Sequence, residues 1–447
     1  MRFRDICMNK ITITEIMNGP WKDYSIATCE ERGIPQFADG LKPVQRFLLY
    51  QGFKTAKNHF DKVNAIGSAI AAAGYAHGDA SATAALSAMG ASYSNNLPFF
   101  EGDGNFGNVL NPTPAAPRYI FAKLASYIDY LIKDTDLCPE DDDPEILPPK
   151  YYLPIIPMCL VNGIKGIATG YAVDIPPHDP ISIIDYLIKK CDGKNGKEIK
   201  PKYYSFEGKI VKEDEKYVLT GIVDIKSPIH FVVKELPPIF NTSSSYEKYL
   251  RTLMEKGKIQ NYENNSCDDK FCYEVWLKKG TRWTEEEIYK TLRLSSNHNL
   301  NLTTVMPDGK LHIWDKKTGI QDIVDEFYKF RLPFVQTRIE QKREELNELI
   351  QFYEGFVKFI ESVIAKKVIF KDLTEESFEK LLLNKYNIPS RFIERVMNAP
   401  MRTFTTNKID DLRKKLEIAN NDYSYYSSTT AEQEYKKDLE ELKKVIK

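Results

Sequence analysis

The stretch GYAHGDASATAALSAMGAS, residues 74–92, sets the expected fold of the first part of the chain. Its opening residues, GYAHGD, form a short glycine-containing link between two segments with helical patterning, 61–73 and 80–93. Two helices joined in this way form a helix-turn-helix pattern, and Asp79 is a suitable N-cap for the second helix. That helix carries mostly small side chains, which permit close approach either to another helix or to a DNA groove. Close helix packing is the commoner explanation, and both interpretations stay open here.

A second stretch, NPTPAAPRYIF at residues 111–121, places an arginine and a tyrosine on an irregular approach. The preceding segment EGDGNFGN, residues 101–108, contains three glycines among polar residues. One interpretation is a loop that leads into a helix beginning near Phe121. The other is that Tyr119 must reach a partner outside the chain.

Composition indicates a folded protein of two to four domains, because the chain has 447 residues and 42% of them are hydrophobic. The 62 basic and 63 acidic residues nearly cancel, so a nucleic-acid partner would require a local basic patch. Seven scattered cysteines favour a reducing compartment over a disulfide framework. The sequence shows no apolar signal segment and no apolar run of bilayer length, so we expect a soluble, cytoplasmic protein without a membrane partner.

The middle of the chain has a mixed pattern. Residues 137–150, LCPEDDDPEILPPK, are an acidic, proline-rich linker whose carboxylates we expect to be solvated, so no metal ligand is assigned there. Beyond it, strands are predicted at 217–225 and 229–236, and Asp308-Gly309 within 303–315 predicts a hairpin. Helices are expected at 180–190, 244–256 and 284–293.

The last part of the chain is helical with a heptad pattern. Apolar side chains recur every seven residues at Ile339, Leu346, Tyr353 and Ile360, with Leu349, Phe356 and Val363 at the interleaved position. A second run ends the chain, with Tyr435, Leu439, Leu442 and Ile446 on one face. We expect two long antiparallel helices with a small helical head, including 387–401, at their far end. A structural stalk and a dimerisation arm look alike at this level.

Four short motifs in this order resemble the breakage-reunion subunits of type IIA DNA topoisomerases, the family that includes the DNA-cleaving subunit of bacterial gyrase. They are RGIPQFADGLKPVQR (32–46), YAHGD (75–79), DGNFGN (103–108) followed by Arg118 and Tyr119, and LVNGIKGIATGYAVDIPPH (160–178). The likeness is greatest to the short phage members of the family. The resemblance implies an α+β, multidomain fold: a winged-helix domain with the catalytic tyrosine at 1–145, a mixed α/β tower domain at 146–318, and an antiparallel coiled coil with a small helical dimer gate at 319–447.

The resemblance also implies site residues. Tyr119 would attack a DNA phosphodiester and hold the broken strand through a 5′-phosphotyrosyl bond during ATP-dependent double-strand passage. A phenol is a weak nucleophile because its pKa is about 10, so it requires a base or a positive field. Arg118 can pair with phosphate oxygens, and Arg32 and His77 are expected at the scissile phosphate.

Four further residues are expected to bind DNA by the same resemblance. Lys42 and Arg46 would hold the DNA backbone, and Asn162 belongs to the fourth motif. Ile167 matches an apolar wedge that enters a base step and bends the duplex. From the residues alone, Ile167 could equally belong to the core of a strand.

The sequence departs from the family pattern at Ala38, Gln45, Phe47 and Tyr75, where basic residues are common. These departures leave a rival hypothesis open, a topoisomerase-like module that clamps or bends DNA without cutting it. The chain shows no glycine-rich ATP site and no acidic cluster of the Toprim kind. ATP and Mg²⁺ are therefore expected on one or more large partner subunits, with double-stranded DNA as substrate and a homodimer formed through the C-terminal gate. If the chain is phage-encoded, its compartment is the host cytoplasm.

Overall fold

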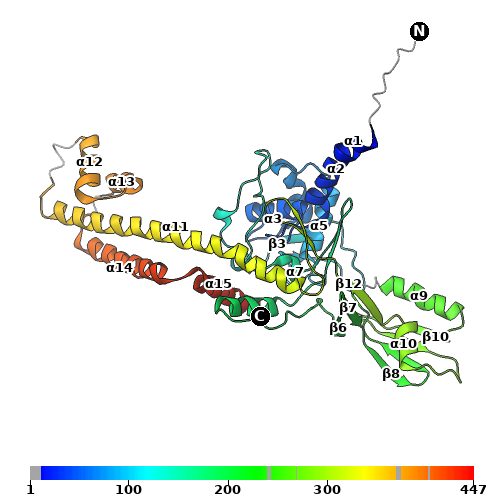
Figure 1. The fold of residues 1–447 in the computed structure, drawn as a ribbon. Coiled ribbons are helices and arrows are strands. Elements are labelled where there is room, and N and C mark those ends of the chain that lie inside the picture. Colours follow the sequence, from blue (N-terminus) through cyan, green and yellow to red (C-terminus); the bar gives the residue numbers. More distant parts are fainter. Residues whose placement is uncertain (1–11, 239–242, 268, 369–373, 401–402, 447) are drawn as a thin grey trace, which may run out of the picture. The chain divides into compact units, whose positions relative to one another are not determined.

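The computed structural model describes residues 12–238, 243–267, 269–368, 374–400 and 403–446 (Figure 1). The chain divides into two compact units. The first comprises Met1–Phe330 together with Asp438–Lys447, and the second comprises Arg331–Lys437. No helix within the described ranges is both long and apolar enough to cross a membrane.

The first unit begins with a helical region. Its helices are α1 (Ile13–Asn18), α2 (Pro20–Thr28), α3 (Pro43–Thr55), α4 (Val63–Ala69, continued by a 3₁₀ turn over Ile70–Ala73) and α5 (Asp79–Gly90). Helices α4 and α5 correspond to the segments predicted at 61–73 and 80–93. The expected N-cap of α5 was wrong by one residue. Gly78 has the extended backbone of an N-cap, and Asp79 is the first helical residue, where its Oδ2 accepts a hydrogen bond from Ser68 (3.1 Å).

Each of the two interpretations of the small-residue helix α5 corresponds to one of its faces. On one face α5 packs closely against α4, since a Cβ at Gly67 would lie 2.6 Å from Cγ2 of Thr83. On the opposite face Ala80, Ala84 and Ala88 are exposed. Small side chains therefore serve helix packing on one side and leave an open, shallow surface on the other.

A three-stranded antiparallel sheet lies beside these helices. Its strands are β1 (Asp61–Lys62), β2 (Phe100–Asp103) and β3 (Phe121–Leu124), in the order β1-β3-β2. The expectation of a helix near Phe121 was wrong. Phe121–Leu124 alternate between half-buried and buried and pair with strands on both sides, which fixes them as the central strand.

The acidic segment 137–150 packs against the end of the α4 region. Leu147 N–H donates to the Ala73 carbonyl (3.1 Å), and Lys150 pairs with Asp142 (2.7 Å). No cluster of three or more His, Cys, Asp or Glu side chains suited to a metal ion occurs among the described residues.

The region after the linker is mixed α/β, as predicted. Its elements are α7 (Met158–Val161), β4 (Ile164–Ile167), β5 (Ala172–Ile175), α8 (Pro180–Cys191), β6 (Lys209–Glu213), β7 (Lys216–Thr220), β8 (Val223–Ser227), β9 (His230–Val233), α9 (Ser243–Glu255), β10 (Asn261–Asn264), β11 (Tyr273–Trp276), α10 (Glu285–Thr291) and β12 (Ser295–Asn299). The three predicted helices and the predicted hairpin, β13 (Thr303–Val305) with β14 (Leu311–Ile313), are confirmed.

The predicted strand 217–225 is two strands in two different sheets. β7 lies in the sheet β12-β7-β6, and β8 lies in the sheet β10-β11-β9-β8. The chain changes sheet at Gly221, where a Cβ would lie 2.2 Å from the Glu235 carbonyl oxygen. An apolar run cannot reveal this break, because both halves have the same β-rich composition.

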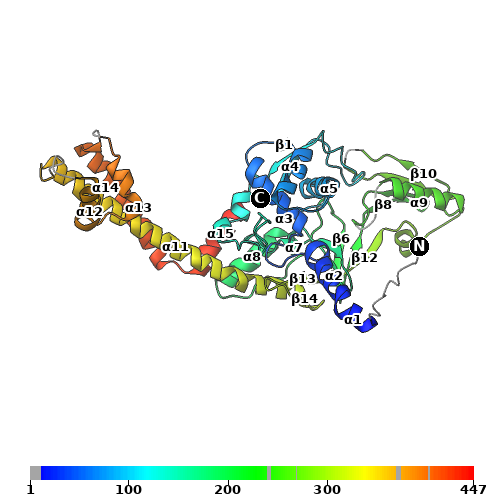
Figure 2. The ribbon, with the colours of Figure 1, turned by 90° about the horizontal axis from the view of Figure 1, so that it is seen from above.

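The second unit contains most of α11 (Gly319–Ile364), with α12 (Glu375–Tyr386), α13 (Ser390–Met397), α14 (Thr406–Ser428) and the start of α15 (Ala431–Val445). The chain returns along α11 in the opposite direction, because Glu361 binds Arg413 (2.9 Å) while Arg338 lies 3.9 Å from Glu434 (Figures 1 and 2). Helices α12 and α13 pack at one end of this pair.

The predicted heptad seam is only partly correct. Ile339, Phe356 and Ile360 are buried, while Leu346, Leu349, Tyr353 and Val363 are half-buried. Phe352 and Phe359, which the prediction omitted, are fully buried because α12 and α13 cover a second face of α11; Phe352 stacks on Phe392 with centroids 4.5 Å apart. On the C-terminal run Tyr435, Leu439 and Leu442 are buried and Ile446 is half-buried.

Candidate active site and DNA interface

Tyr119 lies on a tight turn that precedes β3. Tyr119 is 64% exposed, the largest exposed fraction of any tyrosine in the described part of the chain. Main-chain hydrogen bonds hold the turn: Tyr119 N–H donates to Ala116 (2.9 Å), and Pro117 and Ile120 accept from the first residues of α4 (3.2 and 3.0 Å). An exposed phenol on a fixed backbone is suited to react with a large external substrate.

Arg118 lies directly beside this phenol. Its guanidinium carbon is 4.7 Å from the centroid of the Tyr119 ring, and the side chain is exposed. This places a permanent positive charge over the ring face, where cation–π attraction orients the two groups together. The structure thus brings Arg118 and Tyr119 together as the sequence predicted.

Arg32 is held next to the β4–β5 hairpin by an unusually close main-chain contact. It is the penultimate residue of a π-helical turn, Cys29–Gly33, and its side chain is exposed. A Cβ at Gly33 would lie 2.6 Å from the Ala168 Cβ, and one at Gly166 would lie 1.8 Å from the Gly33 carbonyl oxygen. The two glycines therefore allow the turn carrying Arg32 to lie against the strand that carries Ile167.

Ile167 is the last residue of β4 and is 80% exposed. This exposure rules out a place in the core of the strand, which the sequence had left open. Thr28 anchors the hairpin through a 3.0 Å hydrogen bond with Thr169. A large apolar side chain held out on a two-stranded hairpin is a suitable wedge for a base step.

His77 lies at the end of an aromatic row. The centroid of its exposed ring is 5.3 Å from that of Tyr75. The Tyr75 ring centroid is 5.4 Å from that of Phe47, which is buried. Two of the departures from the family pattern thus form the packing that supports His77. A third, Ala38, is fully buried, so no charged side chain fits there without a partner.

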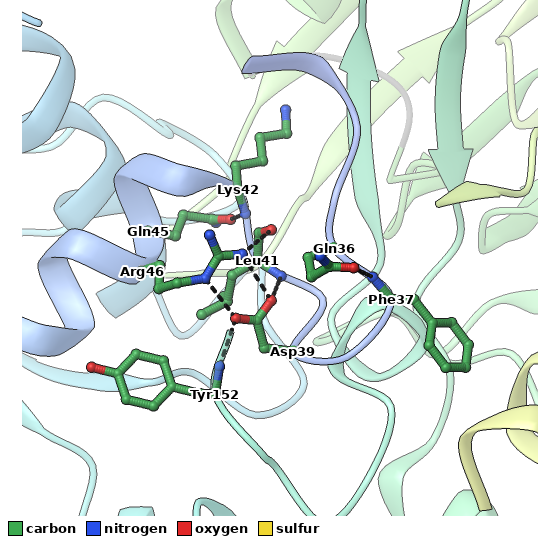
Figure 3. Close-up of polar contacts among 8 residues, drawn as sticks. All are labelled: Gln36, Phe37, Asp39, Leu41, Lys42, Gln45, Arg46 and Tyr152. Atoms are coloured by element: carbon green, nitrogen blue, oxygen red, sulfur yellow. Dashed lines mark hydrogen bonds and ion pairs between the residues drawn. The ribbon is translucent and has the colours of Figure 1, made fainter. Parts of the chain in front are cut away.

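Lys42 is half-buried at the start of α3. Its Nζ donates to the Lys165 carbonyl (2.9 Å), and burial lowers the pKa of its ammonium group. The acceptor is neutral, so the charge of Lys42 has no counter-charge in this contact and can act on a DNA phosphate. Figure 3 shows the side chain pointing away from the neighbouring carboxylate of Asp39.

Arg46 is bound to a buried acid. Its Nε and Nη2 donate to the two carboxylate oxygens of Asp39 (2.8 and 3.2 Å), and Asp39 is 1% exposed (Figure 3). Asp39 also accepts from the backbone N–H groups of Leu41 (3.0 Å) and Tyr152 (3.1 Å). This geometry gives Arg46 a structural role, and its predicted DNA contact stays a prediction.

Asn162 also has a structural role. Its amide oxygen accepts from Leu97 N–H (2.8 Å) and its amide nitrogen donates to the Leu97 carbonyl (2.9 Å). Both ends of the amide are occupied, so the predicted DNA contact finds no support in the geometry. The sequence did not reveal either partner. Leu97 lies 65 positions from Asn162 along the chain, and nothing in the sequence marks Asp39 as buried.

The comparisons with known proteins define the class. A family model that describes the A subunits of DNA gyrase and topoisomerase IV matches residues 32–443. The chain belongs to this family. It is similar to the DNA topoisomerase medium subunit of Enterobacteria phage T4, with 30% identity over 450 residues that cover 98% of this chain and 100% of the phage protein.

Longer single-chain enzymes contain a similar region. The mitochondrial DNA topoisomerase 2 of Dictyostelium discoideum is 29% identical over 99% of this chain, which spans only 36% of that enzyme. A crystal structure of the Plasmodium falciparum topoisomerase II DNA-binding, cleavage and re-ligation domain matches with a TM-score of 0.83 and 26% identity, covering 97% of this chain and 63% of that one. The recognised family and a mixed α/β fold similar to that topoisomerase domain are therefore confirmed.

Proposed function

We propose that this chain is the DNA-cleaving and rejoining subunit of an ATP-dependent type IIA DNA topoisomerase, with Tyr119 as the nucleophile. One observation carries the proposal. Tyr119 is the most exposed of the described tyrosines, it lies on a turn pinned by main-chain bonds, and a guanidinium lies against its ring. Family membership supports the general DNA-cleaving role.

The reaction is a transesterification that keeps the number of phosphodiester bonds constant. The Tyr119 oxygen forms a bond to phosphorus, the bond from phosphorus to the deoxyribose 3′-oxygen breaks, and a 5′-phosphotyrosyl ester and a 3′-hydroxyl result. The phenol proton passes to a base or solvent, and the 3′-oxygen gains a proton. Because the ester is an aryl phosphate, the 3′-hydroxyl can reverse the step without hydrolysis.

Positive groups around the phosphate lower the barrier. Arg118 and Arg32 offset charge that develops on the phosphate oxygens, and His77 is an exposed group that can move a proton. Lys42 holds the DNA backbone, and Ile167 enters a base step to bend the duplex.

The proposed domain division follows the family. Residues 1–145 form a winged-helix domain, 146–318 a tower domain, and 319–447 a coiled coil with a dimer gate. Two copies joined at this gate place two tyrosines on opposite DNA strands. Large partner subunits bind ATP and supply Mg²⁺. When bound, the metal ion would add electrostatic stabilisation of the phosphate. The complex acts in the cytoplasm.

The test is covalent trapping on supercoiled plasmid with the reconstituted complex. Tyr119→Phe should abolish covalent attachment and keep DNA binding, since it removes one exposed hydroxyl. Tyr130→Phe, which alters a tyrosine 39% exposed after β3, is the matched control and should cleave normally. Mapping the adduct to another tyrosine would overturn the assignment of Tyr119.

The same assay addresses the rival function. A wild-type complex that binds and bends DNA but forms no covalent adduct would support a non-cleaving clamp. The buried, uncharged positions of Ala38 and Phe47, where the family often has basic residues, are the observation that favours this rival.

A further inference from the structure

A chain of polar contacts joins the sheet β12-β7-β6 to the hairpin that carries Ile167. His298, on β12, lies between Tyr203 and Asp174: the Tyr203 hydroxyl is 2.6 Å from Nδ1, and Asp174 Oδ1 is 2.7 Å from Nε2. The second carboxylate oxygen of Asp174 pairs with Lys165 Nζ at 3.1 Å. Tyr203 is 8% exposed and the His298 and Asp174 side chains are 11% and 28% exposed, whereas the Lys165 side chain at the end of the network is 74% exposed.

One arrangement of protons satisfies the hydrogen bonds of this network. Burial raises the pKa of Tyr203, so its phenol stays protonated and donates to Nδ1 of His298. In the tautomer with its proton on Nε2, the His298 ring accepts from Tyr203 at Nδ1 and donates to Asp174. Burial opposes ionisation of Asp174, but its bonds to His298 and Lys165 prevail and lower the pKa of the carboxyl group, so Asp174 is a carboxylate.

This network reaches the β4–β5 hairpin, which carries the proposed wedge Ile167. Lys165 and Asp174 are directly opposite each other in the β4–β5 ladder, and Ile167 follows two residues after Lys165 on the same strand. Residues two apart on a strand lie on the same face, so the orientation of Lys165 and that of Ile167 are linked. The main chain adds a second tie, because Asp174 exchanges hydrogen bonds of 2.9 and 3.2 Å with Asn301, just after β12.

The hairpin is also held by the Thr28–Thr169 hydrogen bond, by the packing of Gly33 against Gly166 and by the bond from Lys42 Nζ to the Lys165 carbonyl. It consists of two strands of four residues, and an isolated two-stranded hairpin is marginally stable. A side chain that unstacks DNA must resist the restoring force of the duplex, so the hairpin that carries it requires a rigid support. The His298 contact supplies a directional bond between a packed sheet and this small hairpin.

We propose that His298 is a positioning residue for DNA bending. Through Asp174 and Lys165 it fixes the hairpin, so that Ile167 is held in the orientation required to enter a base step. The inference rests on the proposed wedge role of Ile167. His298 does not touch DNA in this account, and its effect is expected on the bent state more than on affinity.

The experiment measures DNA bending in the complete complex, with a short duplex labelled by a fluorescence donor and acceptor at its ends. His298→Leu removes both ring nitrogens and should lower the ratio of bent to straight DNA about fivefold to tenfold, the scale of one typical hydrogen bond. His298→Gln is the matched variant, because its amide can replace Nε2 as the donor to Asp174; it should bend DNA as the wild type does. Tyr203→Phe, which removes one hydroxyl, should give an intermediate loss and serves if the leucine variant does not fold.

Ile167→Ala separates the two proposals. If Ile167→Ala loses bending and His298→Leu causes no further loss in that background, the two residues act in one pathway and the inference holds. Normal bending by a folded His298→Leu or Tyr203→Phe variant, or a loss that adds to that of Ile167→Ala, would overturn the role of His298 alone. Normal bending by Ile167→Ala would overturn the wedge itself, and with it this inference.

Discussion

Arg46 and Asp39 form a two-point ion pair in which the acid is almost completely removed from solvent, with donor–acceptor distances of 2.8 and 3.2 Å. Removing one partner of a buried pair leaves an uncompensated charge. Arg46→Met should therefore destabilise the first unit by about 3 kcal/mol, the lower end for such pairs because two backbone donors to Asp39 remain.

The measurement is the melting midpoint by calorimetry, and Arg46→Met combined with Asp39→Asn is the control. A neutral amide tolerates the loss of the guanidinium, so the double variant should recover part of the midpoint. Equal midpoints for Arg46→Met and the wild type would contradict the structural role of Arg46.

Lys42 and Arg46 should differ in the salt dependence of DNA binding. Lys42 donates to a neutral carbonyl, so its charge can displace one counterion from DNA, whereas Asp39 already neutralises Arg46. Lys42→Ala should lower the slope of log K against log salt by about one. Arg46→Met, measured below its melting range, should change the slope less, and the opposite order would show that Arg46 is the phosphate contact.

His178 should make stability depend on pH. Burial lowers its pKa to about 4, against an ordinary value of 6.5, and its Nε2 lies 3.2 Å from the Tyr217 hydroxyl. Between these two pH values the unfolded chain binds more protons than the folded chain, so stability is complete above about pH 6.5 and falls as pH drops toward 4. The loss is on the order of 3 kcal/mol at the end of this window.

The check is a series of melting curves from pH 7.5 to 4. His178→Gln keeps a polar group near Tyr217 without a titrating ring, so it should flatten the dependence over this window. His59→Gln, which alters an exposed histidine, should leave the curve unchanged. A wild-type melting midpoint that is constant over the window would show that His178 is not held neutral.

The second unit should mediate homodimer formation. Leu383 on α12 is an exposed apolar side chain (43%) at the helical head. Leu383→Glu would bury an unpaired charge in a head-to-head contact, so sedimentation of the full chain should shift from dimer toward monomer. Ile418→Glu, which changes a 60% exposed residue on α14, is the control. A wild-type chain that sediments as a monomer at high concentration would refute the gate.

Local patterns predicted the longer helices and the strands with the strongest signals, because local physics determines them. The helices at 180–190, 244–256 and 284–293 and the hairpin around Asp308-Gly309 follow from periodicity and turn chemistry, and all are present. The change of sheet at Gly221 was not predictable, because it depends on the approach of Glu235 from another strand.

In the site too, contacts between sequence neighbours could be predicted and contacts between distant residues could not. Arg118 and Tyr119 are adjacent in sequence, so their contact was foreseeable. The partner of Arg46 was not: a basic residue in a DNA-binding motif and one bound to a buried acid look identical until the burial of Asp39 is known. The contacts of His298 with Tyr203 and Asp174 join residues 95 and 124 positions apart, and no local signal marks them.

The turn that carries Tyr119 is shaped by main-chain hydrogen bonds. Substitution of the other side chains on this turn, Arg118 apart, should therefore leave the backbone path unchanged, provided that its prolines remain. In this sense the position of the Tyr119 phenol is insulated from the side chains around it, and substitutions beside it carry little cost to its geometry.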